Sequence, residues 1–229
     1  MPGQIVLAGG EEFRLRCEEM DSFILEATGK RPARVLVLPT AAAFSGPEKA
    51  ASDGVRHFAR LGAVASELMV LDQEQASDEE LIKAVSGASV IYFTGGSPDH
   101  LLETLQGSKL LDCLQRELNA GAIVGGSSAG AMVMGSMMRR PSSREWVQGL
   151  GIAEGIAVLP HHERSDPARV AQELARTVPP ELKVLGIDAR TCCFGTPGSW
   201  RVLGPGRVIA YQNGSWTAFS SGQILPQGF

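Results

Sequence analysis

Ser128 stands in a run of small residues, "IVGGSSAGAMV" (123–133), between an apolar stretch and a helical pattern. Residues 126–130, GSSAG, have the form Gly-x-Ser-x-Gly, in which small flanking residues let a strand and a helix crowd around a sharp turn that exposes the central hydroxyl. Ser128 is therefore a candidate nucleophile for acyl transfer. Because five small residues also occur in turns that only pack a helix on a sheet, the surrounding segments must decide.

A nucleophilic serine needs a base, and the chain has four histidines. His161 and His162 end a predicted strand, at the sheet edge where open parallel folds place their sites. His57 lies inside a predicted helix, where a surface or partly packed role is expected, and His100 opens a helix near a Gly-Gly pair. We favour His161 as the base, with His162 as the alternative because successive strand side chains point to opposite faces.

Acyl transfer also requires donors for the developing oxyanion. The N–H of Ala129, the residue after the candidate nucleophile, is one such donor. Gly96 can supply the second, because a Gly-Gly pair after a strand lets bare backbone approach a substrate. The same pair also makes the turn into the helix that Pro98 opens.

Short Val/Ile/Leu runs alternate with amphipathic segments along most of the chain. Strands are expected at 4–10, 34–40, 66–72, 89–96, 155–162 and 183–191, and helices at 13–28, 48–62, 77–87, 98–118 and 166–178. This alternation predicts a doubly wound α/β fold with a mostly parallel sheet and helices on both faces. From residue 192 onward, short β segments and an Asn-Gly turn predict an antiparallel, β-rich C-terminal edge of one domain spanning 1–229.

The overall composition excludes several classes of function. A net charge of −4 without a basic run argues against nucleic acid or an anionic membrane as a partner. The N-terminus has no basic leader, and no apolar run is long enough to span a bilayer, so a cytoplasmic location is expected. Four cysteines without a CxxC pair are expected to be buried, reduced thiols, and no cluster with metal-ligand spacing is recognisable.

Three segments resemble one known family. "YFTGGSPDHLLETL", "GGSSAGAMV" and "GLGIAEGIAVLPHHER" are similar in order and spacing to the dipeptidase E and cyanophycinase family of serine peptidases, whose fold resembles the class I glutamine amidotransferases. The resemblance implies Ser128 as nucleophile, His161 as base, and the N–H groups of Gly96 and Ala129 as the oxyanion hole. Acyl transfer by a serine requires no metal, and no cofactor is expected.

The chain departs from the family at the acid that orients the histidine. The family has a glutamate in a segment like Gly-Ile-Asp-Glu, where "GIDART" has Ala189. Asp188, one residue earlier, and Glu145, in the loop between nucleophile and histidine, are the two candidates for that role. Each has a simpler explanation, a turn cap for Asp188 and a solvated loop charge for Glu145. A third alternative is that no acid is present.

The substrate side is less well defined by the sequence. Members of the resembling family cleave dipeptides with an N-terminal aspartate or an aspartate-arginine polymer. Arg164 follows His161 closely and is a candidate for holding a carboxylate, whereas Arg169 meets the polymer-cleaving pattern only partly. We expect cleavage of short peptides. An amidase or esterase acting on a non-peptide substrate, or a catalytically impaired binding protein, are the alternatives, and a homodimer paired through the C-terminal β segments is compatible with the sequence.

Overall fold

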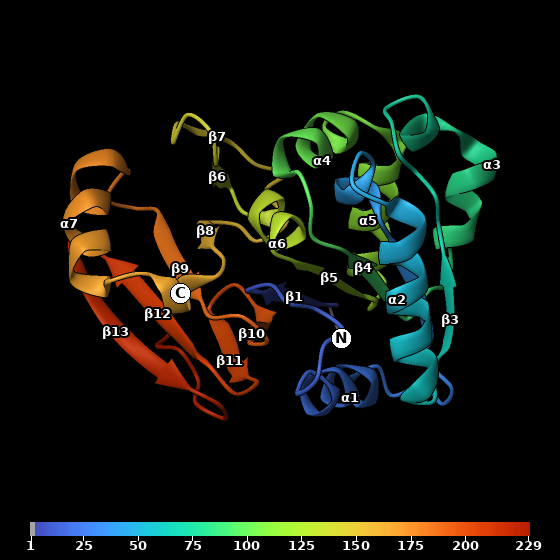
Figure 1. Ribbon diagram of the computed structural model, residues 1–229, viewed down its shortest axis with the longest axis horizontal. Coiled ribbons are helices and arrows are strands. Elements are labelled where there is room, and N and C mark those ends of the chain that lie inside the picture. The colour runs from blue at the N-terminus through green and yellow to red at the C-terminus, as the bar shows by residue number, and fades with distance from the viewer. Residues whose placement is uncertain (1–2) are drawn as a thin grey trace.

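The computed structural model describes residues 3–229, which form two β-sheets side by side with most helices around the larger one (Figure 1). The larger sheet has the order β11-β10-β1-β5-β4-β2-β3. Its strands β1, β5, β4, β2 and β3 run parallel, and β10 and β11 add antiparallel to the β1 edge. The predicted α/β fold with a mostly parallel sheet and a β-rich C-terminal part is confirmed. The strands are β1 (Gln4–Ala8), β2 (Arg34–Leu38), β3 (Val64–Glu67), β4 (Val90–Phe93), β5 (Ile123–Ser127), β10 (Cys192–Thr196) and β11 (Ser199–Leu203).

A second sheet has the order β13-β12-β9-β8. The segments 155–162 and 183–191, which the sequence predicts as strands, contribute β8 and β9 to this second sheet rather than to the larger one. Strand β1 already has β5 on one side and β10 on the other, so the later strands pair with each other and with the C-terminal hairpin instead. The remaining strands are β6 (Met137–Arg139), β7 (Trp146–Gln148), β8 (Ile156–Leu159), β9 (Lys183–Ile187), β12 (Arg207–Gln212) and β13 (Ser215–Ser220), with β6 and β7 forming a separate two-stranded hairpin.

Two of the predicted helices are divided in the structure. The helices are α1 (Glu18–Ala27), α2 (Pro47–Arg60), α3 (Glu79–Ile82), α4 (Pro98–Leu105), α5 (Lys109–Asn119), α6 (Ala129–Met134) and α7 (Pro167–Thr177). The single helix predicted over 98–118 is two, because Gly107 has φ +72° and the Ser108 hydroxyl accepts the N–H of Leu111 to begin a new helix. The segment predicted as 77–87 is a short α3 followed by a 3₁₀ turn at Lys83–Val85.

The segment from 9 to 17 is a loop rather than the start of the first predicted helix. Glu11, Phe13 and Arg16 all have positive φ, at 57°, 60° and 78°, which no right-handed helix accommodates. Helix α1 therefore begins only at Glu18. The loop follows the carboxyl end of β1, the edge at which an open parallel sheet presents its site.

One hydrophobic core extends from the larger sheet into the smaller one. Leu7 and Ile91 of the larger sheet belong to the same buried cluster as Leu185 and Val208 of the smaller sheet, and Trp200 lies fully buried within it. The opposite face of the larger sheet packs a second cluster beneath α1 and α2. The four cysteines are buried and free, and the adjacent pair on β10 contributes one side chain to each cluster, as alternation along a strand requires.

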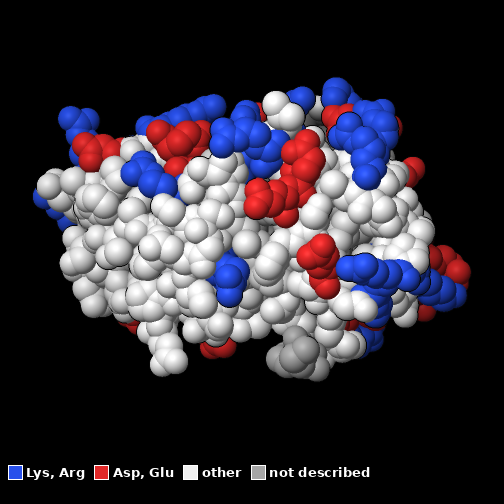
Figure 2. Space-filling view, turned by 90° about the horizontal axis from the view of Figure 1, so that it is seen from below, with Lys and Arg blue, Asp and Glu red and all other residues white. Residues whose placement is uncertain are grey.

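The molecular surface carries charges of both signs. Seen from below, Lys and Arg are interspersed with Asp and Glu along one rim, and a broad area of this face is uncharged (Figure 2). Within residues 3–229, no helix combines the length and the apolar character needed to cross a membrane.

Candidate active site

Ser128 occupies the turn between β5 and α6. Its φ of 50° and ψ of −109° are strained for a residue with a side chain, at a cost on the order of 1–3 kcal/mol, and its N–H donates to the carbonyl of Ala8 at 3.0 Å. A Cβ at Gly126 would lie 2.5 Å from the carbonyl carbon of Gly130, so the glycines allow α6 to approach β5 this closely. The GSSAG segment thus forms the sharp strand-to-helix turn that the sequence predicts.

His161 lies against Ser128 and comes from the smaller sheet, beyond the end of β8. Its Nε2 is 3.2 Å from Oγ of Ser128. The residue lies beyond the end of β8 with φ 53° and ψ 39°, and its N–H donates to the carbonyl of Gly9 at 2.8 Å. Its imidazole packs on Gly10, where an added Cβ would be 2.2 Å from Cε1. A bond to the tip of β1 and the bare backbone at Gly10 therefore position the ring.

His162 has a different role from its neighbour. Its buried Nε2 lies 2.6 Å from the Tyr211 hydroxyl, and its ring covers Gly186, where a Cβ would be 2.5 Å from Cδ2. Burial lowers the pKa of His162 below its ordinary value, so the ring is neutral near pH 7. It secures the end of β8 against β9 and β12 and does not contact Ser128.

The other two histidines serve elsewhere. His57 is fully buried, with Nε2 2.7 Å from Oδ2 of Asp21, so the expected surface or partly packed role is corrected to a buried pair between α1 and α2. Burial raises the pKa of Asp21, and the hydrogen bond from His57 opposes that rise. His100 bonds the carbonyl of Leu71 at 2.8 Å.

No acid holds the second nitrogen of the His161 ring. Nδ1 is buried and has no hydrogen-bond partner among residues 3–229. One oxygen of Asp188 accepts the N–H of Arg207 at 2.9 Å and the other is unpaired, whereas Glu145 is exposed and accepts the hydroxyl of Ser143 at 3.0 Å. The N–H of Ala189 donates to the side chain of Glu163 at 2.8 Å. Neither predicted acid therefore bonds the imidazole.

The two predicted oxyanion donors flank Ser128. The N–H of Ala129 is the first of α6, where the helix itself offers no acceptor. Gly96 has φ +146°, and a Cβ there would lie 2.1 Å from the carbonyl of Ala41, so only glycine fits this turn. The loop and turn hydrogen bonds of residues 3–229 do not use the N–H of either residue.

Two cavities meet at the nucleophile. The loop-side cavity, of about 630 Å³, is lined by the 9–17 loop and α2, and the hairpin-side cavity, of about 540 Å³, by α6 and the β6–β7 hairpin. Gly96, Ser128 and His161 line both. A bond attacked by Ser128 would thus have one substrate portion on each side.

Charged side chains of both signs line the loop-side cavity. Lys49 and Arg56 both pair with Asp53, and the hydrogen bond from Lys49 is the main reason that the pKa of this carboxyl is lowered. Arg14 and Arg60 also line the cavity and have no acidic partner within 4.0 Å among residues 3–229. Two guanidinium groups are therefore available to a substrate.

The hairpin-side cavity carries three arginines, of which two share one acid. Arg139 and Arg144 both bond Glu173 of α7, and Arg140 pairs with Asp99 at 2.8 Å. The predicted substrate residue Arg164 is 75% exposed, lies 3.5 Å from Glu163 and lines neither cavity.

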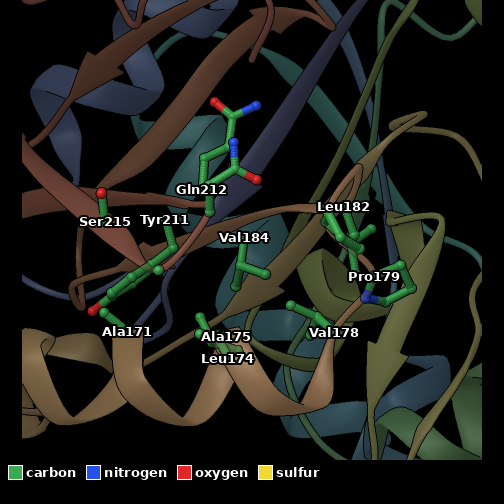
Figure 3. Close-up of a pocket in the computed structure, with 13 residues that line it drawn as sticks. Ala171, Leu174, Ala175, Val178, Pro179, Leu182, Val184, Tyr211, Gln212 and Ser215 are labelled. Atoms are coloured by element: carbon green, nitrogen blue, oxygen red, sulfur yellow. The ribbon is translucent and has the colours of Figure 1, made fainter.

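A separate apolar pocket lies between α7 and the β12–β13 hairpin. Its volume is about 240 Å³, and Leu174, Val178, Leu182, Val184 and the ring of Tyr211 line it (Figure 3). It includes neither Ser128 nor His161. In the part of the chain described, no group of three or more His, Cys, Asp or Glu side chains is arranged to hold a metal ion.

Gly9-Gly10 is among the strand tips that the sequence marks as candidate site positions, and the structure places Gly10 against the His161 ring. The sequence does not mark Glu12, which lies next to the turn at Ser128. In the sequence Glu12 immediately precedes a segment predicted as helix. Its carboxylate accepts the N–H of Gly95 at 2.7 Å and the hydroxyl of Ser127 at 2.8 Å.

Comparison with known proteins identifies the family. The model of peptidase family S51 matches residues 5–196. The chain belongs to this family of serine-type peptidases. The predicted family and enzyme class are confirmed.

Individual relatives of this S51 peptidase are distant in sequence. A cyanophycinase from Synechococcus elongatus is 29% identical over 221 residues, which cover 90% of this chain and 67% of the relative. An uncharacterized peptidase from Pasteurella multocida is 26% identical over 178 residues, covering 73% and 84% of the two chains.

Solved structures share the fold. The crystal structure of a peptidase from an acI-B1 Actinobacterium superposes with a TM-score of 0.86 at 28% identity, covering 99% of this chain and 97% of the other. A putative peptidase E protein from Listeria monocytogenes superposes with a TM-score of 0.61 at 16% identity, covering 93% and 99%, which shows a common fold.

Proposed function

We propose that this S51 peptidase hydrolyses short peptides, with Ser128 as nucleophile and His161 as general base. The observation that carries the proposal is the 3.2 Å contact between Oγ of Ser128 and Nε2 of His161 at the strained turn after β5. A serine at hydrogen-bond distance from an imidazole is the arrangement that activates a hydroxyl for attack on a carbonyl.

The reaction follows from these positions. Oγ of Ser128 attacks the scissile carbonyl carbon while its proton passes to Nε2 of His161, and the N–H groups of Gly96 and Ala129 stabilise the oxyanion. The carbon–nitrogen bond breaks as His161 returns the proton to the leaving amine. Water, deprotonated by the same imidazole, then hydrolyses the acyl-enzyme and regenerates the serine.

We propose that a Ser-His pair, without a bonded acid, performs this chemistry. The unpaired Nδ1 of His161 supports it, as does the engagement of Asp188 with the backbone of Arg207. An acid normally fixes the tautomer and stabilises the imidazolium. Here the bond to Gly9 and packing on Gly10 fix the orientation of the ring, and the imidazolium forms without a bonded counter-charge.

The preferred substrates are peptides with an acidic residue, aspartate above all, on the N-terminal side of the scissile bond. The guanidinium groups of Arg14 and Arg60 in the loop-side cavity support this assignment, since neither is neutralised by a nearby acid. Small peptides suit the site better than a polymer, because Arg164 and Arg169, the residues that resemble a polymer-cleaving pattern, line neither cavity at Ser128.

Hydrolysis of Asp-Leu, Asp-Arg, β-Asp-Arg, Ala-Leu and a simple ester by the wild type and by Ser128→Ala tests the proposal. We expect Asp-Leu to be cleaved well above Ala-Leu, and Ser128→Ala to be inactive on every compound. Cleavage of the ester alone would point to an esterase. No turnover combined with no labelling by a fluorophosphonate would point to a binding protein without an activated serine.

A further inference from the structure

Glu12 is held in a fixed position at the head of the loop-side cavity. One carboxylate oxygen accepts the N–H of Gly95, and the other accepts the hydroxyl of Ser127, at 2.7 and 2.8 Å. The first contact joins the turn that precedes Gly96, and the second joins the residue before the nucleophile. Glu12 therefore bridges the two turns from which the oxyanion donors project.

The loop that carries Glu12 has a backbone conformation imposed by its surroundings. Positive φ at Glu11 and Phe13 is unfavourable for residues with a side chain and persists only where packing enforces it. The Phe13 ring packs among His57, Phe58 and Tyr92 with centroids 5.5 to 5.7 Å away. Because the Phe13 ring packs on one side of the loop, the carboxylate of Glu12 lies on the other side, at the turn that carries Ser128.

Glu12 makes no ion pair with the described residues of the protein. Among residues 3–229 no Lys, Arg or His nitrogen lies within 4.0 Å of its oxygens, although Glu11 next to it approaches Arg190 at 3.7 Å. A carboxylate beside the place where an oxyanion forms opposes the build-up of negative charge. A carboxylate has about four acceptor positions, and the two protein donors use only two of them. The remaining acceptor positions are open to a positively charged group of the substrate.

The distances place such a charge next to the scissile carbonyl. A point at the Cβ position of Gly95 lies 3.1 Å from Oε1 of Glu12 and 3.4 Å from Cβ of Ser128, so the carboxylate and the nucleophile flank one small space. In a peptide, only one atom separates the α-amino nitrogen from the carbonyl carbon of its own residue. An unblocked N-terminal residue attacked by Ser128 would bring its ammonium group into this space.

We propose that Glu12 binds the free α-ammonium group of the residue whose carbonyl is attacked, so that the enzyme removes N-terminal residues and rejects blocked peptides. The inference rests on the proposed peptidase activity. It assigns to Glu12 a specificity role that is separate from the acid-base chemistry of Ser128 and His161.

Kinetics of Asp-Leu and N-acetyl-Asp-Leu with the wild type, Glu12→Gln and Glu11→Gln test this proposal. Because a charge-assisted hydrogen bond contributes about 1.5–3 kcal/mol, we expect Glu12→Gln to lose about 10- to 100-fold in kcat/KM on Asp-Leu. The same variant should leave the slow cleavage of the acetylated peptide unchanged or faster. Glu11→Gln, which alters the adjacent carboxylate, should keep the wild-type preference, and Glu12→Asp should restore part of it.

The rate of fluorophosphonate labelling of Ser128 separates this proposal from the proposed activity. The reagent has no ammonium group, so Glu12→Gln should be labelled no more slowly than the wild type. An equal loss on both peptides together with slower labelling would overturn the proposal and make Glu12 only a clamp for the oxyanion turns. Equal cleavage of both peptides by the wild type would also overturn it while leaving the peptidase intact. A wild type that neither cleaves peptides nor reacts with the reagent would instead refute the proposed activity.

Discussion

Gly10 illustrates how backbone alone positions a side chain at this site. The His161 ring lies on it so closely that a Cβ would be 2.2 Å from Cε1 and 2.6 Å from Nε2, and no acid bonds the opposite nitrogen. In a triad, the acid orients the imidazole. Here the backbone that follows β1 packs against the ring, so substitutions at Gly10 should act directly on the proposed base.

We therefore predict that Gly10→Ala lowers kcat at least about tenfold with little change in KM, since a displacement of the base near 1 Å is enough for such a loss. Gly62→Ala is the matched control. Gly62 also has positive φ, +89° against +113° for Gly10, but an added Cβ there meets nothing within 4 Å. Both variants should lose about 1–2 kcal/mol of stability from backbone strain, and only Gly10→Ala should lose turnover. Equal kcat values in steady-state assays would show that the ring is not held by Gly10.

At this scale the sequence predicts chemistry only where a short pattern requires a specific backbone. GSSAG requires a strained turn, and the structure has that turn at Ser128 with His161 at hydrogen-bond distance. The sequence does not show whether Asp188 or Glu145 orients His161, because the answer depends on where loops from two sheets end. In the structure neither carboxylate bonds the ring. Glu12 escaped notice because its role comes from contacts with residues more than 80 positions away.

Among the elements, the β6–β7 hairpin determines the second side of the site. It brings Arg139, Arg140 and Arg144 to the hairpin-side cavity. Glu173 of α7 forms ion pairs with both Arg139 and Arg144. This cluster retains a net positive charge. If the N-terminal residue of a dipeptide lies in the loop-side cavity, its C-terminal carboxylate faces the hairpin.

We predict that Arg144→Gln raises KM for Asp-Leu several-fold and leaves Asp-Leu-amide unaffected, because a partly exposed ion pair contributes up to about 1 kcal/mol. Arg169→Gln on α7 is the control, since that side chain is 89% exposed and lines neither cavity. Steady-state kinetics on the two peptides measure the effect. A parallel change for acid and amide would indicate that the hairpin does not recognise the carboxylate.

The order and type of most elements follow from the sequence, but their ends and their partners do not. The hydrophobic periodicity does not show that Gly107 and Ser108 divide a long amphipathic segment into α4 and α5. It also cannot show which strand lies beside which. The pairing of β10 with β1 decides that β8 and β9 form a second sheet, and this contact joins residues far apart in the chain.

The fold brings Ser128 of the larger sheet against His161 beyond the end of β8, so the proposed catalysis requires the two sheets to keep their relative position. The two sheets share one hydrophobic core, since Leu185 of the smaller sheet packs in the same cluster as Leu7 and Trp200 of the larger.

The prediction of one domain over 1–229 implies that the two sheets unfold cooperatively. We expect a single unfolding transition, with tryptophan fluorescence and far-ultraviolet circular dichroism coinciding in urea. Leu185→Ala should lower the free energy of unfolding by about 2–5 kcal/mol and shift both signals together. Ile224→Ala, at a side chain 57% exposed, should leave the midpoint nearly unchanged. If the two signals of Leu185→Ala are instead lost at different urea concentrations, the two sheets are separate folding units. The contact between Ser128 and His161 would then need substrate binding to keep the two sheets together.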